Sequence, residues 1–180
     1  MRKSNTSSPE NIYLIGFMGA GKSTIGKRLA RKMDWKFVDT DFYIQKLAGM
    51  NILDIFFEKG EKVFRRMESA VVRKVSVGKR QVIALGGGAF LSDRNRKRIR
   101  RSGISIYLKA KISTLEGRLK KVRKKRPLLR TGASVRALMR VRRMYYEKAD
   151  LKIQTDGQAP SQSTSEIVKK LMRTGKVLSP

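Results

Sequence analysis

The stretch Gly16-Phe17-Met18-Gly19-Ala20-Gly21-Lys22-Ser23 decides the fold. It fits the pattern G-x-x-x-x-G-K-[ST]. A short apolar run, residues 11–15, precedes it and predicts a buried strand. Residues 22–33 follow it with apolar or small positions at helical spacing and predict a helix. Strand, glycine-rich turn and helix are together the setting in which this pattern forms a phosphate-binding loop, or P-loop.

The chemistry of a P-loop explains the residue types in it. Glycines let the backbone wrap around an anion, and the following helix adds the positive end of its dipole. Lys22 is expected to reach the β- and γ-phosphates of a nucleotide, and the hydroxyl of Ser23 to bind Mg²⁺. The nucleotide-binding residues expected here are Gly19, Ala20, Gly21, Lys22, Ser23 and Thr24.

The rest of the chain alternates between strand and helix patterns. Further strands are expected at 36–38, 81–85, 104–108 and 151–154. Helices are expected at 42–48, 52–58, 61–77, 93–101, 113–125, 134–149 and 165–172. This alternation predicts an α/β domain with a five-stranded parallel sheet flanked by helices. The 180 residues fit one domain at 11–173, with a disordered tail at 1–10 and a flexible end at 174–180.

Composition excludes several classes of protein. The chain has no cysteine and no histidine, so proton transfer must use a carboxylate, a lysine or water. No apolar run approaches the roughly 20 residues that cross a bilayer, and no signal-peptide pattern is present, so a cytoplasmic protein is expected. Lys and Arg number 43 against 14 Asp and Glu, a net charge of +29 that attracts anions.

Three further clusters carry candidate chemistry. Asp39 and Asp41 end the second strand and, in strand-like geometry, point the same way, one toward a metal and one toward a hydroxyl proton; the alternative is a helix N-cap. The turn 86–88 is three glycines, which let a backbone approach a ligand or simply turn tightly. Arg65, in Phe64-Arg65-Arg66-Met67-Glu68, offers a guanidinium fork for a carboxylate.

Six motifs together resemble the shikimate kinase family in order and approximate spacing, over about residues 11–173. They are the P-loop, Asp39-Thr40-Asp41, Phe64-Arg65-Arg66-x-Glu68, Gly86-Gly87-Gly88, Arg126-Pro127-Leu128-Leu129 and Tyr145-Tyr146-Glu147-Lys148-Ala149-Asp150. The resemblance implies a P-loop kinase of the nucleoside monophosphate kinase type, with a mobile lid at about 120–133. It also implies phosphorylation of the shikimate 3-hydroxyl with ATP and Mg²⁺, on the way to chorismate and aromatic amino acids, by a monomer.

The resemblance also implies roles for individual residues. Asp41 would contact the substrate hydroxyls and act as base, and Asp39 would lie near the metal. Arg65, Gly87 and an arginine before Tyr145 would bind shikimate; Arg142 fits that position best, and Arg143 competes with it.

Further roles concern the nucleotide and the support of the site. Arg126 would close on the phosphates and Arg118 would pack on adenine. Glu68 would support Arg65 through an ion pair, and the loop 155–157 would edge the adenine site.

Two alternatives remain open on the sequence. One is another small-molecule kinase of the same fold, such as a gluconate kinase, although Arg65, Gly87 and Arg142 favour a carboxylate-bearing acceptor. The other is a nucleic-acid-binding protein, suggested by the net charge of +29. No nucleic-acid motif is found and aromatic content is only 7%, so only nonspecific polyanion binding is expected.

Overall fold

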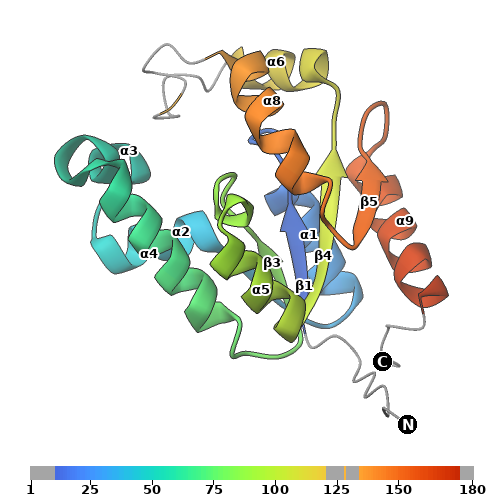
Figure 1. Ribbon diagram of the computed structural model, residues 1–180. Coiled ribbons are helices and arrows are strands. Elements are labelled where there is room, and N and C mark those ends of the chain that lie inside the picture. Colours follow the sequence, from blue (N-terminus) through green and yellow to red (C-terminus); the bar gives the residue numbers. More distant parts are fainter. Residues whose placement is uncertain (1–10, 121–127, 129–133, 175–180) are drawn as a thin grey trace, which may run out of the picture.

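The computed structural model describes residues 11–120, 128 and 134–174. A five-stranded parallel sheet forms its centre, in the order β2-β3-β1-β4-β5 (Figure 1). The strands are β1 (Asn11–Ile15), β2 (Lys36–Asp39), β3 (Gln81–Ala84), β4 (Gly103–Lys109) and β5 (Leu151–Gln154). The predicted sheet is therefore confirmed. The tail 1–10, residues 175–180 of the expected flexible end and all of the expected lid except Lys120 and Leu128 lie outside the described residues.

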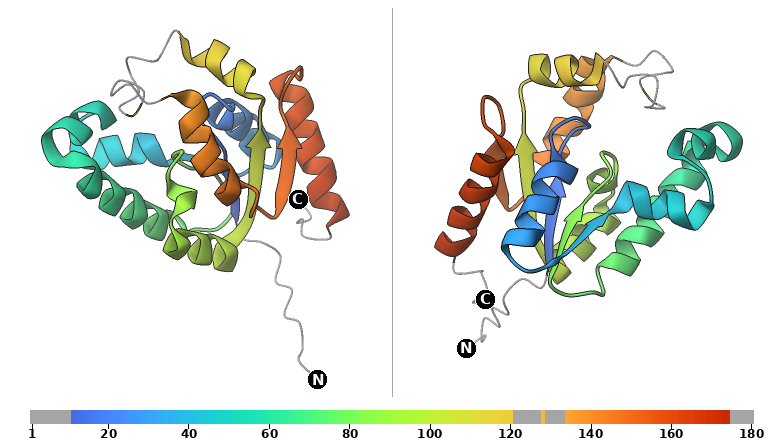
Figure 2. Two further views of the ribbon diagram at one scale, coloured as in Figure 1. Left: turned by 45° about the horizontal axis from the view of Figure 1, so that its top comes forward. Right: turned by 180° about the vertical axis from the view of Figure 1, so that it is seen from behind.

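Helices cover both faces of the sheet (Figures 1 and 2). On one side α1 packs against α9, and on the other α5 packs on β4 and against α4. The helical segments are α1 (Lys22–Lys32), α2 (Thr40–Ala48), α3 (Ile52–Asp54), the π-helical η1 (Ile55–Lys59), α4 (Gly60–Val75), the 3₁₀ segment η2 (Ala89–Leu91), α5 (Asp93–Ser102), α6 (Ile112–Leu119), α8 (Val135–Tyr146) and α9 (Pro160–Arg173). None of these described helices is long and apolar enough to cross a membrane.

The core lies where the central strands are covered on both faces. Every residue of β1 is buried, and so are the five central residues of β4. Parallel strands buried on both faces show as continuous apolar runs, which is why these strands were predictable from the sequence.

The strand order brings the sequence motifs together. The P-loop follows β1, Asp39 ends β2 and the glycine turn 86–88 follows β3. Because β2, β3 and β1 are neighbours and parallel, their carboxyl ends meet at one edge of the sheet. The three motifs therefore face a common space.

Two local expectations were wrong. Asp39 and Asp41 do not share a strand face, because β2 ends at Asp39 and α2 begins at Thr40. Residues 52–58 do not form one helix: the short α3 gives way to a π-helical turn at Ile55, which leads into α4.

The helix α9 begins at Pro160 rather than at Ser165. Proline fits the first turn of a helix because the N–H group that it lacks would have no helical partner there. The side chain of Gln162 also accepts a hydrogen bond from the Ala159 N–H at 2.7 Å. The first turns bury Ser163 and Thr164 instead of apolar residues, so their hydrophobic periodicity is weak.

Candidate active site

The P-loop forms one side of a pocket of about 940 Å³. Gly19 and Gly21 have φ values of 82° and 93°, in the left-handed region that glycine adopts without strain. Within the described residues, no side chain caps the N-terminus of α1. The first N–H groups of this helix are thus left for a ligand, and an anion such as phosphate suits that position.

Lys22 lies inside the curve of the loop. Its Nζ donates hydrogen bonds to the carbonyl oxygens of Gly16 at 2.9 Å and Phe17 at 3.0 Å. These bonds hold the ammonium group beside the backbone that surrounds the phosphate position. Lys22 also lines the pocket, as its expected role requires.

Ser23 and Asp39 form a paired oxygen site at the pocket wall. The Ser23 hydroxyl donates to Asp39 Oδ2 at 2.6 Å, while Asp39 Oδ1 accepts from the backbone N–H groups of Asp41 and Phe42. Asp39 is therefore an N-cap of α2 and a partner of the P-loop serine at the same time. A hydroxyl and a carboxylate side by side fit Mg²⁺, which prefers oxygen ligands and binds through few protein groups.

The glycine turn is packed against charged side chains. A Cβ atom on Gly86 would overlap Asp41 and lie 2.9 Å from Glu68 Oε1, and one on Gly88 would overlap the guanidinium of Arg65. At Gly87 a Cβ would lie 3.1 Å from Arg142 Nη1. The three glycines leave room for two carboxylates and two guanidinium groups that line the pocket.

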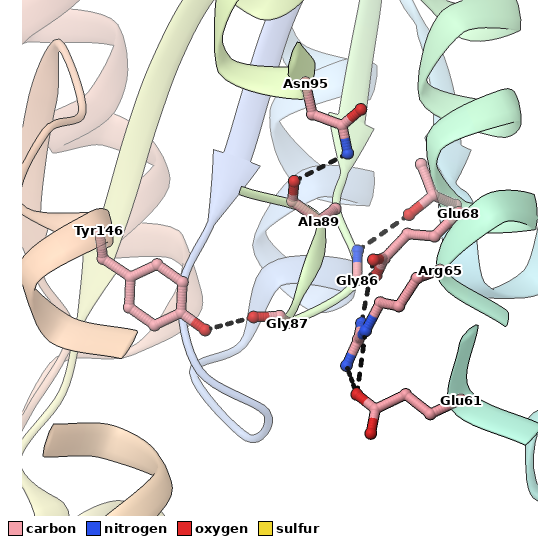
Figure 3. A network of polar contacts seen from close by, with 9 residues as sticks. Glu61, Arg65, Glu68, Gly86, Gly87, Ala89, Asn95 and Tyr146 are labelled. Carbon is pink, nitrogen blue, oxygen red and sulfur yellow. Dashed lines mark hydrogen bonds and ion pairs between the residues drawn. The ribbon is translucent and has the colours of Figure 1, made fainter. Parts of the chain in front are cut away.

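Arg65 is fixed by two carboxylates of its own helix (Figure 3). Its Nη1 lies 2.9 Å from Glu68 Oε2, and its Nη2 lies 3.0 Å from Glu61 Oε1. Glu68 is buried, and both members of this ion pair line the pocket. The guanidinium also lies 5.2 Å from the ring centroid of Phe64, within the range of a cation–π contact.

Burial and charge act against each other on this pair. Burial raises the pKa of the Glu68 carboxyl above its ordinary value, although Arg65 opposes the shift. Burial alone would lower the pKa of Arg65, but attraction to Glu68 and Glu61 gives a net rise. Arg65 therefore stays charged and available to an anionic ligand.

The structure separates Arg142 from Arg143. Arg142 is only 4% exposed and lines the pocket, with its Cζ 5.5 Å from the ring centroid of Phe17. Arg143 is exposed, pairs with Glu147 at 3.7 Å and does not line this pocket. Arg142 is thus the arginine before Tyr145 that faces the pocket.

Tyr146 does not line the pocket but bonds to Gly87, which does. Tyr146 follows Arg142 by one turn of α8. Its hydroxyl donates a hydrogen bond to the Gly87 carbonyl (Figure 3). The hydroxyl is also a hydrogen-bonding neighbour of Arg142, and burial raises the pKa of Tyr146 to about 12. Tyr146 ties α8, and with it Arg142, to the glycine turn.

The far end of the pocket is formed by Arg118 and the start of α9. Arg118 Nη1 donates to the Gly19 carbonyl at 3.0 Å, so its side chain lies over the P-loop. Thr155, Gln158 and Ser163 line the same end. Asp156, next to Thr155, accepts the Lys111 N–H and fixes this loop to the start of α6.

All the described residues expected to bind nucleotide, substrate or metal or to act in catalysis line this one pocket. They are Gly19, Ala20, Gly21, Lys22, Ser23, Thr24, Asp39, Asp41, Arg65, Gly87, Arg118 and Arg142. Of the expected adenine loop 155–157, which is described in full, Thr155 lines the pocket. Arg126 lies outside the described residues. Among those described, no group of three or more Asp and Glu side chains could hold a metal by itself, so Ser23 and Asp39 remain the candidate ligands.

Sequence reasoning missed several lining residues. Gln45, Asn51 and Phe56 also line the pocket, from α2, from the turn before α3 and from η1. No motif marked them. The π-helical turn that carries Phe56 is a distortion often found at functional sites, but it shows only in the structure.

This fold and pocket define a P-loop kinase of the nucleoside monophosphate kinase type. The model of the family described as Shikimate kinase matches residues 18–172. The shikimate kinase of Thermodesulfovibrio yellowstonii is 41% identical, in an alignment that covers 91% of this chain and 96% of that enzyme. The shikimate kinase of Persephonella marina is 40% identical, with 88% of this chain and 96% of that enzyme covered. The chain belongs to the shikimate kinase family, whose members are ATP-dependent kinases that act on a hydroxyl group.

Solved structures agree with this assignment. A shikimate kinase from Acinetobacter baumannii in complex with shikimate has a TM-score of 0.85 and 32% identity, covering 92% of this chain and 94% of its own. A gluconokinase from Sinorhizobium meliloti 1021 has a TM-score of 0.58 and 18% identity, covering 92% and 93%. The second likeness shows a common fold alone, so the gluconate kinase alternative gains no support from it.

Proposed function

We propose that this pocket transfers the γ-phosphoryl group of ATP to the 3-hydroxyl of shikimate, with Mg²⁺ held by Ser23 and Asp39. The observation that carries the proposal is that the P-loop and two guanidinium groups, those of Arg65 and Arg142, line one pocket. The guanidinium groups lie against the neighbouring glycines 88 and 87, so a single carboxylate can contact both. The carboxylate of Asp41, from α2, lies against Gly86, the first glycine of the same turn.

The proposed reaction follows from these positions. The substrate oxygen forms a bond to the γ-phosphorus, the bond from that phosphorus to the bridging oxygen breaks, and ADP leaves. Asp41 accepts the hydroxyl proton, because it is a carboxylate that lines the pocket beside the glycine turn and the chain has no histidine. Lys22 and the N-terminus of α1 stabilise negative charge on the phosphate oxygens.

Two further groups complete the proposal. When bound, Mg²⁺ neutralises charge on the β- and γ-phosphates. Arg126 is proposed to close on the same phosphates, on the resemblance of its motif alone. Arg118 is proposed to pack on adenine, from its place over Gly19.

The experiment is ADP release with ATP and Mg²⁺, with and without shikimate, at moderate salt to screen nonspecific charge. We expect release that depends on shikimate and does not occur with gluconate or nucleoside monophosphates. The Lys22→Met variant should lose turnover yet still bind shikimate, because Lys22 acts on the phosphates. ATP binding without shikimate-dependent release would overturn the substrate assignment.

A further inference from the structure

A second pocket, of about 690 Å³, lies between α6 and α8 at the carboxyl end of β4. The two helices contact each other at one end of the molecule (Figure 1). Five cationic side chains line the pocket: Lys109, Lys111, Arg136, Arg140 and Arg143. Its volume is in the range of ordinary small-molecule sites, about 300–1,000 Å³. No described residue that lines it also lines the active-site pocket.

The α8 helix serves the two pockets with different faces. Arg136, Arg140 and Arg143 are four and three residues apart and so share one face of the helix. Arg142 is buried and lines the active-site pocket. The geometry of the helix therefore directs three of these four arginines to the second pocket, and Arg142 alone among the four to the proposed kinase site.

The second pocket is electrostatically suited to an anion. Its described lining includes no Asp or Glu. Nearby carboxylates offset part of the charge: Glu116 lies 3.1 Å from Arg136, and Glu147 lies 3.0 Å from Lys109 and 3.7 Å from Arg143. Asp156 is a further acidic neighbour of Lys111. Five cations line the pocket itself, so a net positive field remains there.

Tyr107 gives the pocket a polar group in need of a partner. The residue is fully buried, and its hydroxyl has no hydrogen-bond partner among the described residues. Arg143 and Glu147 are its charged neighbours. Buried polar groups are nearly always paired, and an unpaired hydroxyl costs about 1–3 kcal/mol. Because the hydroxyl has almost no accessible surface, a ligand oxygen beside Arg143 would supply the missing acceptor only after a lining side chain shifts.

The remaining lining is largely apolar, with Ala110, Ile112 and Met139 among it. We propose that this second pocket binds a small organic anion. Its apolar body contacts Ala110, Ile112 and Met139, and its carboxylate or phosphate group is held by Arg140 and Arg143. A shift of the lining side chains on binding lets the buried hydroxyl of Tyr107 donate to the same anionic group. The proposal does not depend on the identity of the kinase substrate.

The test uses isothermal titration calorimetry on the full chain saturated with ADP, Mg²⁺ and shikimate, which fill the active-site pocket. The probes are 1-naphthyl phosphate and 1-naphthoate, with 1-naphthol and inorganic phosphate as partial probes. We expect at least one naphthyl anion to bind about tenfold more tightly than either partial probe, about 1.4 kcal/mol. The stronger of the two anions identifies the charged group. Equal binding of 1-naphthol, or no binding once the active site is filled, overturns the proposal.

Variants locate the binding. The Arg140→Ala/Arg143→Ala variant should weaken binding of the preferred anion by about tenfold or more. The Arg100→Ala/Arg101→Ala variant on α5 removes the same charge from another surface and should leave binding within about twofold. Equal loss in both would show attraction to overall charge and overturn the site.

Tyr107→Phe gives a further readout. It should weaken anion binding without lowering the melting temperature of the ligand-free protein, because it removes an unpaired buried hydroxyl. Unchanged anion binding in this variant would show that the hydroxyl of Tyr107 does not contact the anion.

Discussion

Arg142 and Tyr146 lie one helical turn apart on α8, and both contact the glycine turn. Arg142 is buried beside the ring of Phe17, whereas the next residue, Arg143, is exposed and paired with Glu147. A step of one residue turns a helix by about 100°, which carries the two side chains to different surfaces. The same residue type therefore has two different environments and should show two different mutational effects.

Arg142→Ala should raise the KM for shikimate by about 10- to 100-fold, because it removes a charge-assisted hydrogen bond worth about 1.5–3 kcal/mol. Arg143→Ala is the matched control and should change KM less than about twofold. Steady-state kinetics with shikimate varied at saturating ATP measures both. A larger effect from Arg143 would reverse the assignment.

Gly88→Ala tests the packing between the glycine turn and Arg65. The backbone of Gly88 has φ −100° and ψ −19°, which alanine adopts without strain. The added Cβ would displace the Arg65 guanidinium, so KM for shikimate should rise about 3- to 30-fold, that is by roughly 0.6–2 kcal/mol.

Two controls accompany the Gly88→Ala variant. Its unfolding free energy should stay within about 1 kcal/mol of the parent, since the overlapping group is the end of a flexible side chain. Gly117→Ala is the control substitution, because among the described residues, apart from its chain neighbours and its own helix backbone, no atom lies within 4 Å of its added Cβ. An unchanged KM in Gly88→Ala would mean that Arg65 does not set substrate affinity.

For single residues, the sequence identified the glycine turn as part of the site but did not show why glycine is needed there. Gly86, Gly87 and Gly88 were expected to let backbone approach a ligand. In the structure they make room for Asp41, Arg142 and Arg65. Spacing along the chain could not show this, because the four segments involved meet only in the folded sheet.

Among the secondary-structure elements, α8, β4 and β5 are connected through Glu147. It follows α8 and contacts Lys109 of β4 and Lys152 of β5, each at 3.0 Å. Hydrogen bonds from these two lysines lower the pKa of the Glu147 carboxyl below its ordinary value. A carboxyl with a lowered folded-state pKa stabilises the fold above its unfolded pKa and loses that effect as pH falls.

Glu147→Gln should therefore lower the free energy of unfolding by about 0.5–1 kcal/mol at neutral pH, the range of a surface ion-pair network. The difference from the parent should decline as pH falls through the ordinary carboxyl range, near 4.5, toward the lower folded-state pKa. Urea unfolding at several pH values measures it. A difference that grows on acidification would contradict the assignment.

Element boundaries were predicted well where apolar periodicity was strong and poorly where polar groups make the core. The strand Asn11–Ile15 matches its predicted range, because it is an apolar run buried on both faces. The start of α9 was missed because Ser163 and Thr164 occupy buried positions. Asp41 was expected in strand-like geometry, but the alternative that was held open is what occurs: Asp39 caps α2, so the strand ends at Asp39, two residues before Asp41.

At the scale of the whole molecule, strand order makes the site. The sequence predicted a parallel sheet but not the order β2-β3-β1-β4-β5. That order puts the ends of β1, β2 and β3 together, while α4 and α8 bring Arg65 and Arg142. Most of the predicted set therefore shares one pocket, although the residues span more than a hundred positions of sequence.

The net charge of +29 should affect how fast anionic substrates arrive. We expect kcat/KM for shikimate to fall several-fold between about 0.05 and 0.5 M NaCl, while kcat changes little, because salt screens long-range attraction. Parallel assays in sucrose at matched viscosity control for slower diffusion. A kcat/KM independent of salt would show that the charge does not speed substrate capture.

The most direct test of the account compares shikimate with its uncharged methyl ester as phosphoryl acceptors. For the parent enzyme we expect kcat/KM to be at least about 100-fold higher with shikimate, since two guanidinium contacts are lost with the ester. In the Arg65→Ala/Arg142→Ala variant that preference should shrink to less than about tenfold. A preference for the acid that survives intact in this variant would contradict the claim that Arg65 and Arg142 select the substrate by its carboxylate.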